Sequence, residues 1–436
     1  MTGKQIERCR GRLERFLVEL LKPLGRCERR RWGGVYVRGL LLDGERKSIG
    51  AMVPRLPDGN EQNLQQFVSQ SPWPWEPLWH RLALKLCRSF TATAWVIDDT
   101  GFPKQGTHSV AVHRQYSGTL GKTGNCQVAV SLHAAGPRGS SALAWRLYLP
   151  QVWARDEARR GEAGVPAEAT FRKKWELALD LLDLARSWGL PPQTVLADAG
   201  YGDVTEFRRG LESRGLCYAV GVTSLVRVWV EPPSLTRHAR CPTGRPPLRQ
   251  WDYAGQKPQS VRAVAEGERA QFRTVIWRQG SRGPMRGRFL ARRVQAAHGY
   301  VEGEAPGKEV WLLIEWPEGE PQPMKYFLCD LPRSLSLKRL VDVVHGRWRI
   351  EQDYQQLKEE LGLDHFEGRS WRGWHHHVTL VMLAHAFLRL EQARGRKAVS
   401  WTLPQTRREL QRLLCTWTGI CCYCGAQVTT GCGRGP

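Results

Sequence analysis

Two apolar runs in the sequence each end in an aspartate, and this pattern limits the fold strongly. The run Thr93–Asp98 (TAWVID) alternates well enough to be one strand, and Thr194–Asp198 (TVLAD) is typical of a short buried strand. A third acid, Glu351, lies inside a helical repeat. Carboxylates gathered from distant segments can hold two divalent cations, so these three acids are candidates for one metal site.

The segments between the two aspartates predict a mixed sheet. Further strands are expected from His108, Asn125 and Ser141, and an amphipathic helix over 168–190 is closed by Gly189 and Pro191. Antiparallel strands, a helix and then a strand ending in a carboxylate form the element order of a ribonuclease-H-like α/β (mixed α+β) fold. The first and fourth strands of that fold are neighbours. Asp98 and Asp198 would then face each other although they are 100 positions apart.

The next block of sequence is strand-rich and separates Asp198 from Glu351 by 153 positions, more than one connection needs. We interpret residues 216–331 as an inserted β domain. Residues 270–295 within it carry no acidic residue but seven arginines, interleaved with Phe272, Trp277 and Phe289. The arginines suit a surface that binds a nucleic-acid backbone, and the aromatic rings suit stacking on an exposed base. The alternative is an ordinary pair of strands with solvated arginines. The arginines are Arg273, Arg278, Arg282, Arg286, Arg288, Arg292 and Arg293.

The segment around Glu351 has helical periodicity. At about 100° per residue, one apolar stripe forms, and three charged residues share an adjacent stripe. Glu351 is therefore expected at the edge of the core, and a plain salt bridge from Arg347 at i, i+4 is the alternative role. The apolar stripe is Val343, Ile350, Tyr354, Leu357 and Leu361, and the charged stripe is Arg347, Glu351 and Lys358.

The charge of the chain indicates a nucleic-acid partner. Its 65 Lys and Arg residues against 42 Asp and Glu residues give a formal charge of +23, as expected of a protein that neutralises phosphates. The basic, helical-looking residues 1–88 suit a DNA-binding region, although a solvated helical face has the same composition. The beginning of the chain has no apolar signal segment, and its longest apolar stretch, from Val378, is too short to span a bilayer. We expect a cytoplasmic, nucleoid-associated bacterial protein with no membrane contact.

Long strings around the three acids resemble the catalytic blocks of insertion-sequence transposases of the DDE superfamily, in the group with a β insertion before the glutamate. The strings are IDDTGFPKQGTHSVAVHRQYSGTLGKTGNCQVAVS, LADAGYGD and RWRIEQDYQQLKEELGLDHFEGRSWRGWHHHVTLVMLAHAFL. The resemblance covers roughly residues 10 to 390. It implies a helical DNA-binding region (1–88), a ribonuclease-H-like core in two parts (89–215 and 332–395), the β insertion (216–331) and a tail (396–436).

The resemblance also implies roles for individual residues. Asp98, Asp198 and Glu351 would be the catalytic, metal-binding triad. In the family's glutamate signature, Arg347, Glu351 and Lys358 occupy their positions, whereas Val344 stands where a tyrosine is expected. Residues expected to contact DNA are Arg347, Trp348 and Lys358 near the glutamate, and Arg282, Arg286 and Arg288 in the insertion. Asp99 is expected on the opposite side of the sheet from Asp98.

The implied reaction is metal-dependent cleavage at transposon ends followed by strand transfer into target DNA. Mg²⁺ suits all-carboxylate ligation, Mn²⁺ should substitute, and no nucleotide cofactor is expected. The partners would be terminal inverted repeats and target DNA, held by a homodimer or a larger synaptic complex. Two other functions stay open: a ribonuclease-H-like endonuclease without strand transfer, and an inactive transposase-derived regulator.

Three further motifs carry less weight. SGTLGKTGN lacks a Walker A motif because Tyr116 stands where glycine is needed. Three consecutive histidines, 375–377, cannot all bind one metal on a helix, and they would mark a helix start or touch DNA. The tail cysteines Cys415, Cys421, Cys424 and Cys432 include one C-x₂-C pair, which leaves either half of a zinc knuckle or an unstructured tail.

Overall fold

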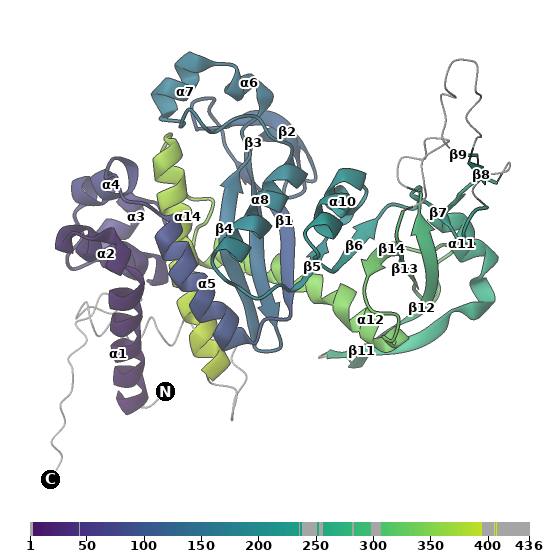
Figure 1. The fold of residues 1–436 in the computed structure, drawn as a ribbon. Helices are drawn as coiled ribbons and strands as arrows, with labels where there is room; N and C mark the ends of the chain where they lie inside the picture. Colours follow the sequence, from purple (N-terminus) through teal and green to yellow (C-terminus); the bar gives the residue numbers. More distant parts are fainter. Residues whose placement is uncertain are drawn as a thin grey trace, which may run out of the picture. The chain divides into compact units, whose positions relative to one another are not determined.

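The computed structural model describes residues 3–42, 44–234, 236–237, 251–252, 256–280, 283–297, 307–394, 405 and 407. Arg282 and the four tail cysteines lie outside the described residues. The chain divides into two compact units. The first comprises Met1–Thr93, Asp98–Pro191 and Arg349–Pro436, and the second comprises Ala94–Ile97 and Pro192–Trp348. Both contain helices and strands, so the fold is mixed α/β with a large mixed sheet (Figure 1).

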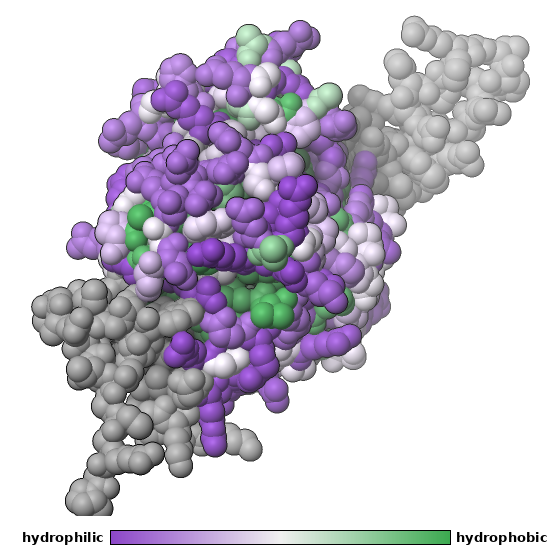
Figure 2. Space-filling view, turned by 90° about the vertical axis from the view of Figure 1, so that its left-hand side faces the viewer, coloured by the Kyte–Doolittle hydropathy of each residue, from purple (hydrophilic) through white to green (hydrophobic). Residues whose placement is uncertain are grey.

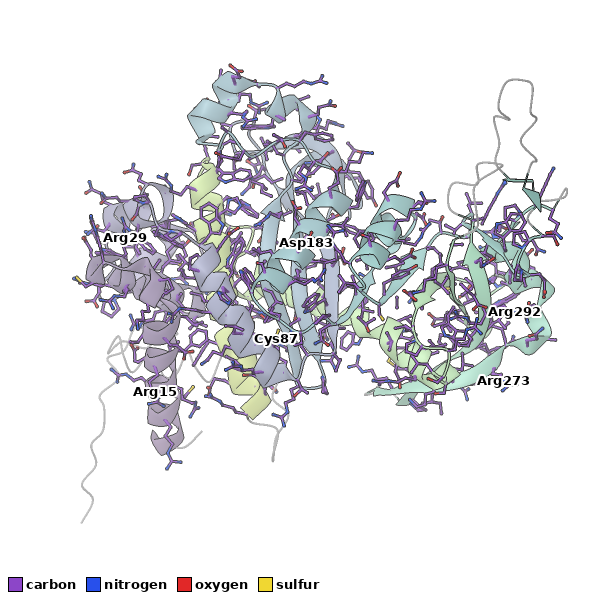
Figure 3. The ribbon with its side chains drawn as sticks, viewed as in Figure 1. Arg15, Arg29, Cys87, Asp183, Arg273 and Arg292 are labelled. Atoms are coloured by element: carbon purple, nitrogen blue, oxygen red, sulfur yellow. The ribbon has the colours of Figure 1, made fainter. Side chains whose placement is uncertain are left out.

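Helices dominate the amino-terminal part of the first unit, as predicted. They are α1 (Gly3–Leu20), α2 (Cys27–Leu41), α3 (Ile49–Met52), α4 (Glu61–Ser69) and α5 (Glu76–Phe90), with 3₁₀ turns at Lys22–Leu24 and Val53–Arg55. Arg15 on α1 and Arg29 on α2 are two of the basic side chains (Figure 3). Hydrophilic residues dominate the face in Figure 2.

The strands of the first unit form a β-meander next to β1 (Ala94–Pro103), which begins in the second unit. They are β2 (His113–Ser117), β3 (Lys122–Gly136) and β4 (Gly139–Leu147), and each pairs antiparallel with the next. The expected strand from His108 begins only at His113, because Ala111 adopts φ 59°, a left-handed conformation that interrupts extended backbone. The strand from Ser141 ends at Leu147, and α6 (Gln151–Ala154) and α7 (Glu157–Ala163) follow. Helix α8 (Lys174–Ser187) packs on β3 and β4.

A buried helix, α14 (Trp371–Arg394), organises the first unit. It contacts α2, α4, α5 and β4, and most of its side chains from Gly373 to Leu388 are buried. A helix that is covered on all sides belongs to a core. Among the described residues, no helix is long and apolar enough to cross a membrane.

The second unit is built on a mixed sheet. The start of β1 pairs parallel with β5 (Thr194–Ala197), and β5 pairs parallel with β6 (Tyr218–Val222). From β6 the sheet continues antiparallel through β14 (Lys325–Asp330), β13 (Glu309–Trp316) and β12 (Gly283–Ala296). The strands expected in the insertion therefore extend the sheet that contains β5. Smaller elements complete the unit: α9 (Ala199–Gly202), α10 (Thr205–Ser213), β7 (Arg227–Trp229), β8 (Thr236–Arg237), β9 (Trp251–Asp252), β10 (Gln259–Ser260), α11 (Val261–Gly267), a 3₁₀ turn (Arg269–Gln271) and β11 (Arg273–Gly280).

The segment around Glu351 is helical, as its periodicity predicts, but its winding changes along the segment. It consists of α12 (Leu337–Val344), a 3₁₀ turn (His345–Arg347), α13 (Trp348–Gln355) and a π-helical turn (Gln356–Glu360). Helical periodicity in the sequence does not reveal these changes of winding, because the apolar residues keep nearly the same angular position around the helix axis. In the predicted apolar stripe, Ile350, Leu357 and Leu361 are buried, whereas Val343 and Tyr354 are half-buried.

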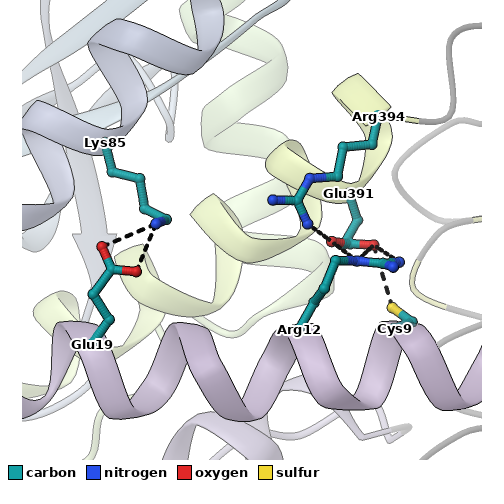
Figure 4. Close-up of polar contacts among 6 residues, drawn as sticks. All are labelled: Cys9, Arg12, Glu19, Lys85, Glu391 and Arg394. Atoms are coloured by element: carbon teal, nitrogen blue, oxygen red, sulfur yellow. Dashed lines mark hydrogen bonds and ion pairs between the residues drawn. The ribbon is translucent and has the colours of Figure 1, made fainter.

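Ion pairs attach α1 to the rest of the first unit, and Figure 4 shows two of them. The Arg12 guanidinium donates to Glu391 of α14 with an Nε–Oε1 distance of 2.8 Å, and the Glu391 side chain is only 7% exposed. Lys85 of α5 donates to Glu19 at 2.7 Å, but the Glu19 side chain is 50% exposed. Burial, and next the Glu391 charge, raise the pKa of Cys9, beside this pair, to about 12. The thiol therefore stays protonated.

Replacing Glu391 by Gln should weaken the attachment of α1 far more than replacing Glu19 by Gln. The buried, charge-assisted pair should contribute about 1.5–3 kcal/mol, whereas an exposed pair contributes about 0–1 kcal/mol. Urea unfolding followed by circular dichroism measures both losses. Equal losses for the two variants would contradict this assignment.

Candidate active site

Asp98 lies in the middle of β1, directly after a fully buried apolar segment. Trp95, Val96 and Ile97 are each 0% exposed, whereas Asp98 and Asp99 are half-buried. The Asp98 Oδ1 accepts the Asp99 backbone N–H at 2.8 Å. The Asp99 carboxylate forms an ion pair with Lys174 of α8 at 3.0 Å. The two neighbouring acids therefore have different surroundings, and Asp99 has a structural partner on α8.

Asp198 follows β5 and stands at the beginning of the short helix α9. Its position depends on a glycine in the neighbouring strand. A Cβ atom on Gly221 of β6 would lie 3.1 Å from the Ala199 nitrogen and 3.3 Å from the Asp198 carbonyl carbon. A side chain at 221 would press on this turn. Asp198 itself is half-buried.

The register of β1 and β5 relates the two aspartates. The pairs Ala94↔Thr194, Trp95↔Val195 and Val96↔Leu196 are in parallel register. Asp98 and Asp198 each come two residues after the last of these pairs. Two parallel strands run in the same direction, so positions that lie equally far beyond a registered pair correspond to each other.

Glu351 lies in the first turn of α13 and is exposed to solvent. The helix that carries Glu351 is attached to the strands of the first unit by residues on its buried side, away from Glu351. Ile350 and Asp353 are fully buried, and the Tyr354 hydroxyl lies 2.7 Å from Ser131 Oγ of β3. The helix therefore presents Glu351 outward from a fixed base.

Lys358 joins the same segment to β1. Its ammonium donates to the Gly101 carbonyl at 2.8 Å and to Thr119 Oγ1 at 3.0 Å. Burial lowers the pKa of Lys358. Gly101 comes three residues after Asp98, so this contact ties the segment that follows Glu351 to the strand that carries Asp98.

Arg347 and Trp348 belong to the second unit, together with Asp198. Arg347 is half-buried in the 3₁₀ turn. The Arg278 guanidinium lies over the Trp348 ring, 4.0 Å from its centroid. One residue earlier on β11, Trp277 stacks on His345 at 3.9 Å with an interplanar angle of 5°. Strand β11 thus packs on the turn that precedes α13.

The described arginines of the segment 270–295 lie on the antiparallel strands β11 and β12, which form a hairpin, and Arg273 and Arg292 are labelled on it in Figure 3. Acids from outside the hairpin pair with part of it. Arg292 lies 3.5 Å from Glu231 and from Glu268, and Arg293 lies 3.3 Å from Glu309. The Arg286 side chain is 64% exposed, and its one described acidic neighbour, Glu318, is 3.9 Å away.

The hypothesis that the hairpin aromatics stack on a nucleic-acid base is wrong for two of the three residues. Phe272 is 8% exposed and Phe289 is 0% exposed, because both face the packed side of the hairpin. Trp277 already stacks on His345. The hairpin therefore offers charge at its surface, and its aromatic rings serve packing.

The histidine cluster 375–377 lies near the beginning of α14, as one of the two interpretations held, and all three rings are buried. Contact with DNA, the other interpretation, is therefore wrong. His375 Nδ1 lies 2.9 Å from the Trp371 carbonyl, and His377 lies between the Tyr36 hydroxyl at 2.8 Å and the Gly362 carbonyl at 3.0 Å. These residues fill the core of the first unit.

Sequence reasoning missed Asp353, which is fully buried two residues after Glu351. Its signal was present, because Asp353 lies three residues after Ile350 and four before Leu357, on the inward side of the predicted stripe. An acidic residue on the inward side of a helix indicates a buried polar contact. Within the described ranges, no group of three His, Cys, Asp or Glu side chains is placed to hold a metal ion.

Residues 19–284, more than half of the sequence, match the family described as DDE superfamily endonuclease. The chain belongs to this family. The matched range contains Asp98 and Asp198 and ends before Glu351. This DDE superfamily endonuclease is also similar to a protein from Microchaete diplosiphon named "Probable transposase for insertion sequence element IS701". The two are 28% identical over 332 residues, which cover 75% of this chain and 74% of the relative.

Acid should destabilise this DDE superfamily endonuclease through its buried histidines. Burial lowers the pKa of His375, His377 and His385 from about 6.5 to about 3 each. Between these values the unfolded chain binds the protons and the folded chain does not. The contribution of these three histidines to the free energy of unfolding is therefore fully present above about pH 6.5. It falls as the pH drops, by up to about 1.4 kcal/mol per pH unit for each histidine.

The His377→Gln variant should show a shallower loss of stability between pH 7 and pH 5, by about one proton. Urea midpoints at several pH values measure this slope. His113→Gln, at an exposed position of β2, is the matched control and should leave the slope unchanged. An identical slope for His377→Gln and the wild type would refute the explanation.

Proposed function

We propose that this chain is a transposase that cuts DNA at the ends of a mobile element and joins the freed 3′ ends to target DNA. Its catalytic residues in this proposal are Asp98, Asp198 and Glu351. The observation that carries the proposal is the parallel register of β1 and β5, which leaves the two aspartates at equivalent positions beyond it. Family membership and the similarity to a probable transposase support the reaction type.

The anchoring of α13 supports the role of Glu351. In the first unit, Lys358 binds the Gly101 carbonyl of β1, and Tyr354 binds Ser131 of β3. These contacts hold the helix that carries Glu351 against the strand that carries Asp98 and its neighbour β3. Glu351 is exposed, so its carboxylate is accessible to an ion or a substrate.

We assign a ribonuclease-H-like core to residues 89–215 and 332–395, with residues 216–331 as an insertion and residues 1–88 as the DNA-binding region. The order of β1 to β5, with α8 before β5, supports this division. The insertion in this proposal extends the core sheet, because its first strand, β6, pairs parallel with β5.

Mg²⁺ is the proposed metal, and Mn²⁺ should replace it. The three candidate residues fit such an ion chemically, because carboxylate oxygens are the ligands that both ions prefer. Asp98, Asp198 and Glu351 would hold these ions, which would supply an activated water and stabilisation of the leaving 3′ oxygen. No nucleotide cofactor is needed.

The protein's own residues supply positioning and charge. Arg347 and Trp348 precede α13, and we propose that they contact DNA near the scissile phosphate. Lys358, whose ammonium is already fixed by Gly101 and Thr119, would present positive charge to the same strand. Fixed cations next to a phosphodiester stabilise the charge that develops during displacement. Arg282, Arg286 and Arg288 are proposed to hold the flanking backbone.

The partners in this proposal are terminal inverted repeats and target DNA, and the working form is a dimer or a larger complex. Joining two ends in one reaction requires both ends to be held together. The formal charge of +23 suits the neutralisation of phosphates on several DNA segments.

The direct test uses labelled DNA from the flanks of the gene, with Mg²⁺, and compares the wild type with Asp98→Ala, Asp198→Ala and Glu351→Ala. We expect the wild type to cut and join, and each variant to bind the ends while its cleavage rate falls by about 10³-fold or more. Cutting without joining would indicate an endonuclease. Binding without metal-dependent chemistry would indicate a regulatory protein.

DNA binding should depend on the exposed hairpin arginines. Arg286→Ala should weaken binding uniformly across sequences and reduce the slope of log K against log salt by about one. Arg292→Ala is the matched control, because two glutamates already neutralise this arginine. Fluorescence anisotropy at several salt concentrations measures both slopes, and equal changes would contradict the assignment of Arg286.

A further inference from the structure

Asp353 is a fully buried carboxylate on the side of α13 opposite Glu351. Its Oδ2 accepts from His133 Nδ1 of β3 at 3.0 Å, and its Oδ1 accepts from Ser140 Oγ of β4 at 2.9 Å. A second ring, His385 of α14, has its Nε2 at 4.0 Å from Oδ1. All three ionisable side chains are 0% exposed. One carboxylate therefore meets groups from two strands and one helix.

The neighbouring contacts repeat this pattern. Tyr354 binds Ser131 of β3, and Gln356 Oε1 lies 3.2 Å from His385 Nε2. His385 Nδ1 lies 2.9 Å from Ser141 Oγ of β4. The charged group nearest this cluster on α14 is Arg389, whose Nε donates to the Ser140 carbonyl at 3.0 Å. Polar contacts thus attach the buried side of α13 to the β3–β4 hairpin.

The hairpin is shaped for this contact. The register of β3 and β4 shifts between Leu132 and His133, and such an irregularity redirects the side chain that it carries. His133 Nε2 is buried and makes no hydrogen bond within the described part of the chain. The Nδ1 atom of the ring, by contrast, donates to the Asp353 carboxylate.

A buried carboxylate is costly, and well-packed apolar residues of similar size are often as stable or more stable. If packing were the only requirement, a leucine at position 353 would fill this buried side of α13. Apolar contacts, however, allow small rotations and shifts that directional hydrogen bonds resist. At about 100° per residue, Asp353 and Glu351 are about 200° apart around α13, so a rotation that moves one moves the other.

We propose that Asp353, held by His133 and Ser140, is a positioning residue that fixes the rotation of α13 and so aims the Glu351 carboxylate. The inference rests on the proposed role of Glu351. Asp353 itself touches neither substrate nor metal in this scheme. Its effect is transmitted through the helix backbone over two residues.

The test replaces the whole polar contact by apolar residues, in the combined variant His133→Leu, Ser140→Ala and Asp353→Leu. Removing Asp353 together with both of its hydrogen-bond donors leaves neither donor unpaired, and His385 keeps Gln356 and Ser141 as partners. The urea midpoint should therefore stay equal to that of the wild type or rise. Single-turnover cleavage at saturating DNA should nevertheless fall about a hundredfold, as expected of a misplacement of about 1 Å. The Mg²⁺ concentration for half-maximal rate should rise, while DNA affinity stays unchanged.

Asp353→Asn is the conservative variant. Its amide oxygen can still accept from Ser140, so it should retain more activity than the combined variant. Thr379→Val is the matched control, because Thr379 is buried on α14 and binds Trp79 and the His375 carbonyl, away from α13. It should change neither the cleavage rate nor the Mg²⁺ dependence.

Hydrogen exchange of the amides in residues 348–355 gives a readout that does not need activity. The combined variant should exchange at least about tenfold faster there than the wild type at an equal urea midpoint. Unchanged exchange or an unchanged cleavage rate would overturn the inference, as would a rate loss explained by a lower urea midpoint. If the wild type cuts no DNA, the proposed function fails, and the exchange data still decide whether the contact fixes α13.

Discussion

The parallel pairing of β1 with β5 is the constraint on which the rest of the structure depends. Neighbouring parallel strands need a long crossover, and the chain supplies it as β2, β3, β4 and α8. The buried residues Trp95, Val96 and Ile97 hold β1 in this place. The registered pairs end two residues before Asp98 and two residues before Asp198, and our proposal for the two aspartates is built on this register.

Much of this arrangement could be predicted from the sequence, because apolar runs and helical periodicity are local signals. The strand before Asp98, the strand before Asp198 and the helix over most of 168–190 are examples. Changes of winding were not predictable, since the π-helical turn at Gln356–Glu360 leaves the apolar phase almost intact. Partners from distant segments were also hidden. Arg286, Arg292 and Arg293 have no acidic residue nearby in the sequence, and they meet Glu231, Glu268, Glu309 and Glu318 only in the fold.

Buried polar groups carry much of the specificity in the first unit. His377 bridges Tyr36 and Gly362, and Asp353 bridges β3 and β4. Burying each of these polar groups has an unfavourable desolvation free energy, and the hydrogen bonds that it forms fix the geometry of its neighbours. An apolar core could be equally stable, but it would leave the orientation of α13 less determined. The chain as a whole carries a formal charge of +23, which suits a DNA partner.

The most direct test of the proposed metal-binding triad is a change of metal preference after Asp98, Asp198 and Glu351 are each replaced by cysteine. A thiolate is a softer ligand than a carboxylate, so the account predicts that cleavage is lost in Mg²⁺ and recovered in part in Mn²⁺ for all three variants. An Asp99→Cys variant should show no such change, because Asp99 pairs with Lys174. If none of the three variants regains cleavage in Mn²⁺ while still binding DNA, these carboxylates do not hold the metal and the account is contradicted.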